Sequence, residues 1–289
     1  MALIELDDVS KLYGFGDATT LALDEVSLKV DKGEFVAVMG PSGSGKTTLM
    51  NVIGLLDKPS HGNYKLGGRD VAHQSAKRQA RLRRDEIGFV FQFYNLLPRL
   101  NVLDNVSLPL AYKGVPPVRR AKRASDILEL VGMRDREYYR PNQLSGGQAQ
   151  RAAIARAIVN NPSIIIADEP TGNLDSHDSR VVMEVLSDIH HQGNTILMVT
   201  HNPELTRYAS RVIYMYDGTI VGDERTKVGE MAKHARRIFF RKPRATDDDI
   251  AAGVSAILKD IPGEEVTAKP KRGRPKGRKR TVRRTRSRR

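Results

Sequence analysis

The chain has 289 residues, carries a net charge of +14 and contains no cysteine. Its length suits one large domain with extensions or two domains, and the lack of cysteine excludes a disulfide framework and a thiolate metal site. No apolar run approaches the roughly 18 residues of a membrane span, and the first residues lack the basic start and long apolar stretch of a secretion signal. These features predict a soluble, cytosolic protein that reaches a membrane only through a partner or a surface contact.

The positive charge is concentrated at the C-terminal end of the chain. Residues 269–289 contain 13 Lys and Arg and no acidic residue, and removing these 13 charges from +14 leaves +1 for residues 1–268. We therefore expect a nearly neutral globular domain over 1–225 and a linker over 226–268 that contains a short helix from Asp249 to Leu258. A disordered basic tail follows, because a block of like charge cannot bury enough apolar surface to fold alone.

The first half of the chain predicts a strand, a glycine-rich loop and a helix in succession. Residues 3–10 and 26–30 alternate between apolar and polar and predict strands of a partly exposed sheet. Glu34–Gly40 is an apolar run that predicts a buried strand, and Lys46–Leu56 has helical spacing. Between them lies GPSGSGKTT, Gly40–Thr48, in the structural context that a phosphate-binding loop requires.

Each residue type in this loop has a chemical purpose. Gly40, Gly43 and Gly45 let the backbone turn tightly and approach phosphate oxygens. Lys46 supplies a point charge to the β- and γ-phosphates, and the Thr47 hydroxyl is suited to Mg²⁺. The predicted nucleotide-binding residues of the loop are Gly40, Pro41, Ser42, Gly43, Ser44, Gly45, Lys46, Thr47 and Thr48.

A second short motif, LSGGQ, occupies Leu144–Gln148. Residues 95–140 before it hold helix-like segments, such as 119–132, that are punctuated by prolines. Residues 146–160 after it predict a helix with Ser145 near its start. The backbone amides and dipole at such a helix start form an anion site.

Two further apolar strands carry polar residues at their carboxyl ends. Ser163–Glu169 ends in Asp168 and Glu169, and Thr195–His201 ends in a histidine. Ligands of open α/β sheets bind outside the carboxyl ends of the strands, so these side chains are expected near Gly40. Asp168 is the expected acidic partner of Mg²⁺, and Glu169 is placed to act as general base on the attacking water. His201 and Gln92 are candidates to sense the γ-phosphate.

Each of these later patterns has an ordinary structural explanation when it stands alone. An acid pair after an apolar strand, a histidine at a strand end, a glutamine after Phe-Val-Phe and two glycines at a helix start are all common features. Their order and spacing together favour a functional explanation.

In that order the motifs resemble the ATP-binding subunit of an ABC (ATP-binding cassette) transporter over about residues 2–225. The matching segments are Tyr13 for the aromatic that stacks on adenine, Gly40–Thr48 for the Walker A loop, Gln92 for the Q-loop, Leu144–Gln148 for the signature, Ile164–Glu169 for the Walker B strand, Gly172–Asp175 for the D-loop and His201 for the switch histidine. The resemblance implies an α/β P-loop NTPase fold with a RecA-like core, an antiparallel β subdomain and an inserted α-helical subdomain.

The resemblance also implies the partners and the roles within the site. It implies ATP and Mg²⁺, with metal contacts from Thr47, Gln92 and Asp168. It implies catalytic roles for Glu169, His201 and Gln92. It implies that two copies, identical or not, meet head to tail, so that the nucleotide-binding site of one copy is completed by residues of the other. The completing residues are Ser145, Gly146, Gly147, Gln148 and Asp175.

Three segments resemble one group within the family, which contains macrolide exporters and lipoprotein-release ATPases. They are 95–100, 105–110 and 167–175. This implies an ATPase on the cytoplasmic face of the membrane that powers a separate permease. The expected transport is export or membrane extraction of a lipid-like, peptide or drug-like substrate. We predict that Asn101–Gly114 lines part of the contact with the permease.

The basic tail is not explained by this resemblance. RGRPK, Arg272–Lys276, resembles the core of an AT-hook, which lies in the minor groove of A·T-rich DNA. The same charges also suit anionic lipid headgroups or any polyanion, and we favour these over DNA for residues 269–289. The alternative functions are a DNA-associated ABC-type ATPase and a translation factor, although translation factors of this family carry two cassettes.

Overall fold

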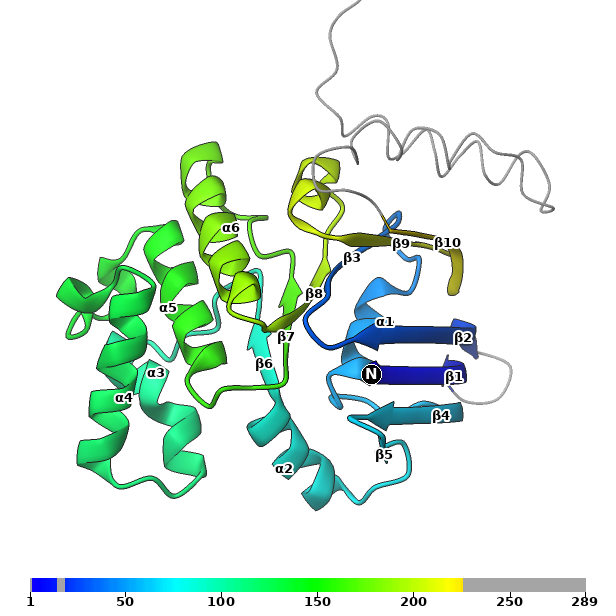
Figure 1. Ribbon diagram of the computed structural model, residues 1–289, viewed down its shortest axis with the longest axis horizontal. Coiled ribbons are helices and arrows are strands. Elements are labelled where there is room, and N and C mark those ends of the chain that lie inside the picture. The colour runs from blue at the N-terminus through cyan, green and yellow to red at the C-terminus, as the bar shows by residue number, and fades with distance from the viewer. Residues whose placement is uncertain (1, 15–18, 226–289) are drawn as a thin grey trace, which may run out of the picture.

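A computed structural model describes residues 2–14 and 19–225 of the chain. The expected linker over 226–268, its helix from Asp249 to Leu258 and the basic tail over 269–289 therefore lie outside the described residues. Within the described part the chain forms two sheets and several helices, which confirms the predicted α/β architecture (Figure 1).

The larger sheet has six strands in the order β10-β9-β3-β8-β7-β6. They are β3 (Phe35–Met39), β6 (Ile87–Val90), β7 (Ile164–Asp168), β8 (Thr195–Val199), β9 (Arg211–Tyr216) and β10 (Thr219–Arg225). All neighbours pair in parallel except β10, which is antiparallel to β9. Strands β3, β7 and β8 are nearly continuous apolar runs because both faces of the sheet are covered, as their sequences predict.

The smaller sheet is antiparallel, with the order β2-β1-β4-β5. Its strands are β1 (Ala2–Tyr13), β2 (Thr20–Asp31), β4 (His61–Leu66) and β5 (Arg69–Asp70). In β2, Val26, Leu28 and Val30 are buried while the residues between them are exposed. This alternation confirms the predicted strand at 26–30, and β1 contains the predicted strand at 3–10.

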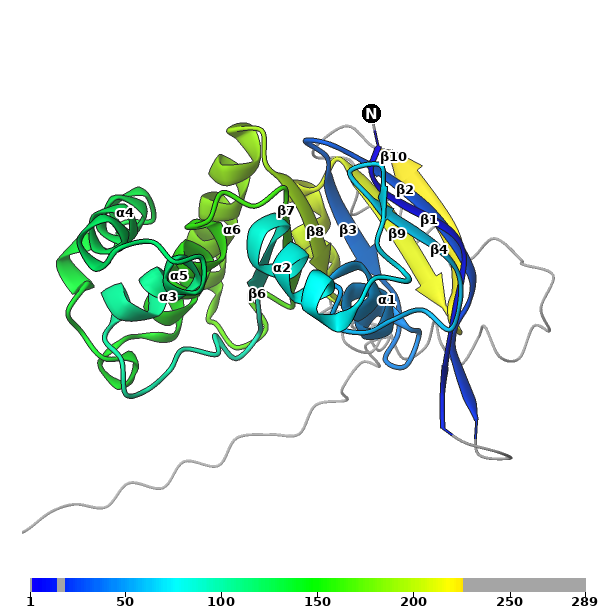
Figure 2. The same ribbon diagram turned by 90° about the horizontal axis from the view of Figure 1, so that it is seen from below.

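The helices fall into groups on different sides of the larger sheet. They are α1 (Lys46–Ile53), α2 (Ala76–Glu86), α3 (Val102–Tyr112), α4 (Pro117–Leu130), α5 (Gly146–Ile158) and α6 (Ser176–His191), with 3₁₀ turns η1 (Arg134–Arg136), η2 (Pro141–Gln143) and η3 (Pro203–Tyr208). Figures 1 and 2 show α3, α4 and α5 together on one side and the antiparallel sheet on the other. This is the RecA-like core with the β and helical subdomains that the sequence implies.

The larger sheet separates two hydrophobic cores. Ile165 and Ala167 of β7 belong to the core shared with α3–α6, whereas Ile164 and Ile166 belong to the core shared with α1 and the antiparallel sheet. Strands β3 and β8 divide their residues in the same alternating way. Successive side chains of a strand point to opposite faces, so each central strand contributes to both cores.

Some elements differ from the sequence patterns. The helix predicted over Lys46–Leu56 ends at Ile53, because Leu55 adopts a left-handed backbone with φ 54°. The patterns do not include α2 and α6. In α2 only Gln79 is fully buried, so the helix lacks the apolar stripe by which a helix is recognised. Helix α6 has such a stripe, which ends in Leu186 and Ile189.

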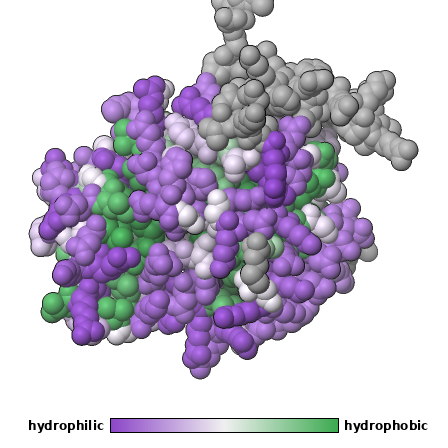
Figure 3. Space-filling view, viewed as in Figure 1, coloured by the Kyte–Doolittle hydropathy of each residue, from purple (hydrophilic) through white to green (hydrophobic). Residues whose placement is uncertain are grey.

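The face seen in Figure 3 is mostly hydrophilic, and its hydrophobic residues gather mainly over the helices at the left. In the described part of the chain, no helix is both long enough and apolar enough to cross a membrane.

Candidate functional site

The glycine-rich loop joins the end of β3 to the start of α1, and two of its glycines are sterically required. A Cβ on Gly40 would lie 2.2 Å from the Met215 carbonyl oxygen and 2.6 Å from Ser44 Oγ. Gly45 has φ 96°, and a Cβ there would lie 2.6 Å from the Ala22 carbonyl oxygen. The loop therefore packs directly on neighbouring backbone and leaves no room for side chains at these two positions.

Lys46 is the first residue of α1, and its side chain folds back over the loop. Its Nζ donates to the carbonyl oxygens of Gly40 at 2.8 Å and Pro41 at 2.7 Å. Burial lowers the pKa of Lys46, while the charges of Glu169 and Asp168 act in the opposite direction. The ammonium group is thus held at the loop, close to the acid pair.

Asp168 and Glu169 lie at the carboxyl end of β7, as their position after the apolar strand predicts. Burial raises the pKa of Asp168, the adjacent Glu169 raises it further, and Lys46 lowers it. Glu169 has a left-handed backbone with φ 44°, and its N–H donates to the Val199 carbonyl oxygen at 2.9 Å. This turn directs the Glu169 side chain toward the end of β8.

The Glu169 carboxylate is held by the two residues that follow β8. Thr200 Oγ1 donates to Oε2 at 3.1 Å, and the His201 backbone N–H donates to Oε1 at 2.9 Å. His201 Nδ1 lies 2.7 Å from the same Oε1. Thr200 is fully buried, whereas the His201 side chain is exposed.

Gln92 follows β6 and contacts the segment after the acid pair. Its Nε2 donates to Asn173 Oδ1 at 3.4 Å, and Asn173 Nδ2 donates to the Gln92 carbonyl oxygen at 3.0 Å. A Cβ on Gly172 would lie 2.8 Å from Gln92 Nε2. Gln92 and the Gly172–Asp175 segment therefore form one packed unit.

The LSGGQ segment forms the start of α5. Ser145 caps the helix by accepting from the Gln148 N–H at 3.2 Å, and the Ser145 N–H donates to Gln148 Oε1 at 3.0 Å. The Gly147 N–H donates to Asp178 Oδ2 at 3.0 Å, and a Cβ on Gly147 would lie 2.3 Å from the Asp178 carboxyl carbon. Asp175 in turn caps α6 by accepting from the Asp178 N–H at 2.8 Å.

Within one chain the glycine-rich loop and the LSGGQ segment are supported by different cores. The buried side chains of α1 belong to the core beside the antiparallel sheet, and those of α5 belong to the core shared with α3–α6. Helix α5 is connected to the acid strand by Gln150, whose Nε2 donates to the Pro170 carbonyl oxygen at 2.7 Å and to that of Phe91 at 3.3 Å.

Tyr13, at the end of β1, lies beside the helix that follows the loop. Its hydroxyl donates to Asp57 Oδ2 at 2.8 Å, and Lys11 Nζ lies 4.8 Å from the centre of its ring. Partial burial and then Asp57 raise the pKa of Tyr13, with a small opposing contribution from Thr48. Tyr13 is 40% exposed.

The structure thus brings Lys46, Asp168, Glu169 and His201 together. Gln92 and α5 bond to the segment that follows the acid pair, whereas Tyr13 bonds to Asp57. The sequence motifs do not single out the residues that make several of these connections: Gln150, Asn173, Asp178 and Thr200. Thr200 could have been predicted from the sequence, because it lies between a buried strand and a candidate catalytic histidine. Nothing in the sequence distinguishes Gln150 from other polar residues of α5.

A glycine-rich loop at the end of a parallel strand, a lysine at the start of the next helix and an acid pair on a neighbouring strand define a phosphate-loop nucleotide hydrolase. Residues 23–172 match the family described as ABC transporter. An ABC transporter ATP-binding protein of Thermotoga maritima is 49% identical over 226 residues, which cover 78% of this chain and 97% of that protein.

Two further similarities support the same assignment. The macrolide export ATP-binding/permease protein MacB of Marinobacter nauticus is 49% identical over 76% of this chain, but the match spans only 34% of that longer protein. The solved dimeric structure of the cassette MJ0796 bound to ADP and Pi superposes with a TM-score of 0.72 at 42% identity, covering 78% of this chain and 99% of that chain. The chain belongs to the ABC transporter family, in which it is an ATP-binding cassette that hydrolyses ATP.

Proposed function

We propose that this cassette powers a separate membrane permease that exports its substrate or extracts it from the membrane, the substrate being lipid-like, a peptide or drug-like. Export is supported by the name of the MacB relatives. A separate permease is supported by the Thermotoga relative, an ATP-binding protein matched over 97% of its length. In this proposal residues 1–225 are the catalytic domain and lie at the cytoplasmic face of the membrane.

In the proposed mechanism the loop Gly40–Thr48 binds the phosphates of ATP and Tyr13 stacks on the adenine. Lys46 exchanges its two carbonyl contacts for the β- and γ-phosphate oxygens. Glu169 accepts the proton of the attacking water, and His201 and Thr200 orient its carboxylate. Gln92 contributes at the γ-phosphate, where its packing against Asn173 links it to the acid strand.

The residues present fit a magnesium ion. Mg²⁺ uses one or two protein oxygens together with phosphate oxygens and water, and the described residues contain no cluster of three or more His, Asp or Glu that would bind a metal unaided. Asp168 has a pKa raised by burial and by Glu169, so a cation beside it stabilises its charged form. Thr47, Asp168 and Gln92 are the proposed protein contacts. When bound, Mg²⁺ neutralises charge on the phosphates.

The nucleotide site is completed by a second copy of the cassette. The helix dipole at the start of α5 favours an anion, yet α5 and the phosphate loop are supported by cores on opposite faces of the sheet. Ser145–Gln148 and Asp175 therefore act on the nucleotide of the partner subunit. The MJ0796 cassette is a dimer in its solved structures. ATP then favours the closed pair, and hydrolysis releases it.

The observation that carries the permease proposal is a groove of about 510 Å³ between α2, β6 and α3. Its apolar lining includes Leu56, Phe89, Phe91, Leu108 and Tyr112, and the Tyr112 side chain is 70% exposed. Exposed apolar surface of this kind is characteristic of a protein contact. The groove includes the C-terminal half of the predicted Asn101–Gly114 contact.

The same groove is linked to the catalytic residues. Arg156 of α5 lines it and donates through Nη2 to the Tyr94 carbonyl oxygen at 2.8 Å. Phe91, which immediately precedes Gln92, is also part of the lining. A permease segment in the groove therefore contacts both the start of the Gln92 segment and the helix that carries Ser145.

The DNA-associated alternative has no support among the comparisons. The proposed contact of residues 269–289 with anionic lipid or nucleic acid lies outside the described residues. It remains a prediction from the charge of that segment alone.

We expect tagged cassette to co-purify a multi-span membrane protein from detergent-solubilised membranes of its source cells. Leu108→Glu places a charge in the groove and should abolish this co-purification while leaving basal ATP hydrolysis unchanged. Val118→Glu, an exposed apolar position of α4 outside the groove, adds the same charge and is the matched control. Recovery of the same membrane protein with Leu108→Glu would show that the groove is not the docking site.

A further inference from the structure

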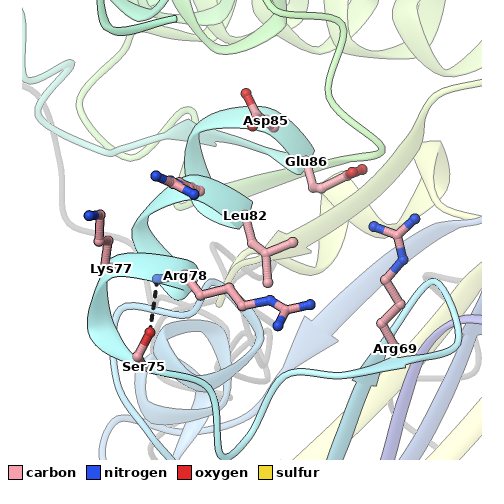
Figure 4. A pocket seen from close by; sticks show the side chains of 8 residues that line it. Arg69, Ser75, Lys77, Arg78, Leu82, Asp85 and Glu86 are labelled. Carbon is pink, nitrogen blue, oxygen red and sulfur yellow. Dashed lines mark hydrogen bonds between the residues drawn. The ribbon is translucent and has the colours of Figure 1, made fainter.

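A second hollow, of about 480 Å³, lies on the other side of α2 and is rimmed by basic side chains. Its lining residues are Arg69, Ser75, Lys77, Arg78, Arg81, Leu82, Asp85 and Glu86. Figure 4 shows Arg78 and Leu82 extending from α2 and Arg69 rising from the β5 side, so that the two guanidinium groups face the same space. Leu82 forms an apolar floor between the basic groups.

The four basic side chains of this hollow have no ion pair or side-chain hydrogen bond with any residue that the structure describes. The two acids nearby are engaged elsewhere: Asp85 pairs with Arg84 at 2.7 Å and lies 3.8 Å from Lys113, and Glu86 accepts from the Ser163 hydroxyl. The Ser75 hydroxyl caps α2. The four cations outnumber the two acids of the lining, so the hollow has a net positive charge.

Helix α2 is a wall shared by this hollow and by the apolar groove. Positions 77, 78, 81, 82 and 85 line the basic hollow, whereas Ala80, Arg83 and Arg84 line the groove. Residues three and four apart lie on one face of a helix, so these two sets of residues lie on two different sides of α2. A permease segment in the groove contacts one side of α2 and leaves the basic side uncovered.

We propose that the hollow between β5 and α2 binds the headgroups of anionic phospholipids in the membrane around the permease, a role that rests on the proposed function. Arginine forks match phosphate oxygens with paired hydrogen bonds. Four cations around one hollow suit a surface of repeated negative headgroups, and Leu82 suits the apolar part beneath a headgroup. This contact orients α2 against the leaflet while the groove holds the permease.

The experiment is sedimentation of the full-length protein with phosphatidylcholine vesicles with and without phosphatidylglycerol. Arg78→Gln/Arg81→Gln is compared with Arg119→Gln/Arg123→Gln on α4, which removes the same charge from exposed positions that line neither hollow. Both variants keep residues 269–289, so any contribution of the tail is equal. We expect binding to phosphatidylglycerol vesicles to weaken about thirtyfold for the α2 variant and to stay near the wild-type value for the α4 variant. Equal weakening of both variants, or of neither, overturns the proposal.

Two further arms separate other sources of negative charge. Inorganic phosphate that binds the wild type but not the α2 variant, with vesicle binding unchanged, assigns the hollow to a soluble phosphate and overturns the lipid proposal. Loss of permease co-purification by the α2 variant, with vesicle binding unchanged, assigns it to an acidic protein segment and also overturns it. The Leu108→Glu variant should bind vesicles as the wild type does. Its co-purification assay therefore tests the permease proposal independently of the lipid proposal.

Discussion

At the scale of single residues, the Glu169 carboxylate is held in place by its neighbours. Three contacts fix its two oxygens, and all of them come from Thr200 and His201 at the end of β8. The Thr200 hydroxyl also accepts from the Asn202 N–H at 3.1 Å, so it is held on both sides. A buried hydroxyl with this geometry orients the base without contacting the substrate, which makes Thr200 a positioning residue in the proposed mechanism.

Thr200→Val removes this hydroxyl at nearly constant volume. We expect kcat for ATP hydrolysis to fall about tenfold, as for loss of one hydrogen bond to a charged group, while the KM for ATP is unchanged. Thr200→Ser should restore most of the rate. Glu169→Gln sets the lower limit, with ATP still bound and turnover reduced by roughly 10² to 10⁴. A higher KM at constant kcat in Thr200→Val would instead place the hydroxyl in nucleotide binding.

The residue types of this site could be predicted from the sequence, but not all of the connections between them. Lys46, Asp168, Glu169 and His201 were expected together because each follows or ends a parallel strand, and such ends meet at one edge of a sheet. Gln150 could not be found in this way. Its function depends on the angle at which α5 packs against the strand, and no local pattern encodes that angle.

At the scale of elements, α2 is connected to the C-terminal end of α3 by a small set of polar contacts. Arg84 donates to the Tyr112 carbonyl oxygen at 3.1 Å and pairs with Asp85, which also faces Lys113. The pKa of Asp85 lies below its ordinary 3.8, mainly because of the Arg84 hydrogen bond, with partial burial acting in the opposite direction. The charged form of Asp85 therefore stabilises the fold.

Asp85→Asn should lower the free energy of unfolding at pH 7 by less than about 1 kcal/mol, because the pair is partly exposed and screened by solvent. A depressed folded-state pKa gives stability that is present above the unfolded-state pKa and is lost as the pH falls through the folded-state value. The difference from the wild type should therefore persist to about pH 5 and shrink below about pH 4. Urea unfolding at several pH values measures it, and a difference that grows in acid would contradict this account.

Elements were predictable where their own residues carry the burial pattern. The strands β3, β7 and β8 are short apolar runs, and the period-2 alternation of β2 is equally clear. Seven of the 11 residues of helix α2 are charged, and its position depends on contacts with β6 and on its Ser75 cap rather than on an apolar stripe. The early end of α1 depends on the left-handed Leu55, a conformation that its residue type does not predict.

At the scale of the whole molecule, the glycine-rich loop and the LSGGQ segment are supported by separate cores, and in the proposed mechanism one chain does not complete a nucleotide site. Lys46 belongs to the side with α1, and Ser145 to the side with α5. In a symmetric pair each site combines Lys46 of one copy with Ser145 of the other.

Mixing two inactive variants tests this arrangement. Lys46→Ala and Ser145→Arg should each hydrolyse ATP poorly alone, the first through weak nucleotide binding and the second through a blocked partner contact. In an equal mixture, about a quarter of the sites combine an intact Lys46 with an intact Ser145 if the copies pair at random with two-fold symmetry. Steady-state ATPase assays should recover up to that fraction of the wild-type rate. No recovery, with mixed pairs verified by chemical crosslinking, would argue against a shared site.

The alternation of side chains along β7 has a consequence for how the sequence can change over time. Ile165 and Ile166 are covalently adjacent, yet they fit into different environments. The volume lost with a smaller residue at Ile165 must be filled by side chains of α3–α6. At Ile166 it must be filled by side chains of α1 and the antiparallel sheet. Tolerance of substitutions at Ile165 therefore carries no information about Ile166. Along β7, residues that pack in the same core are two positions apart.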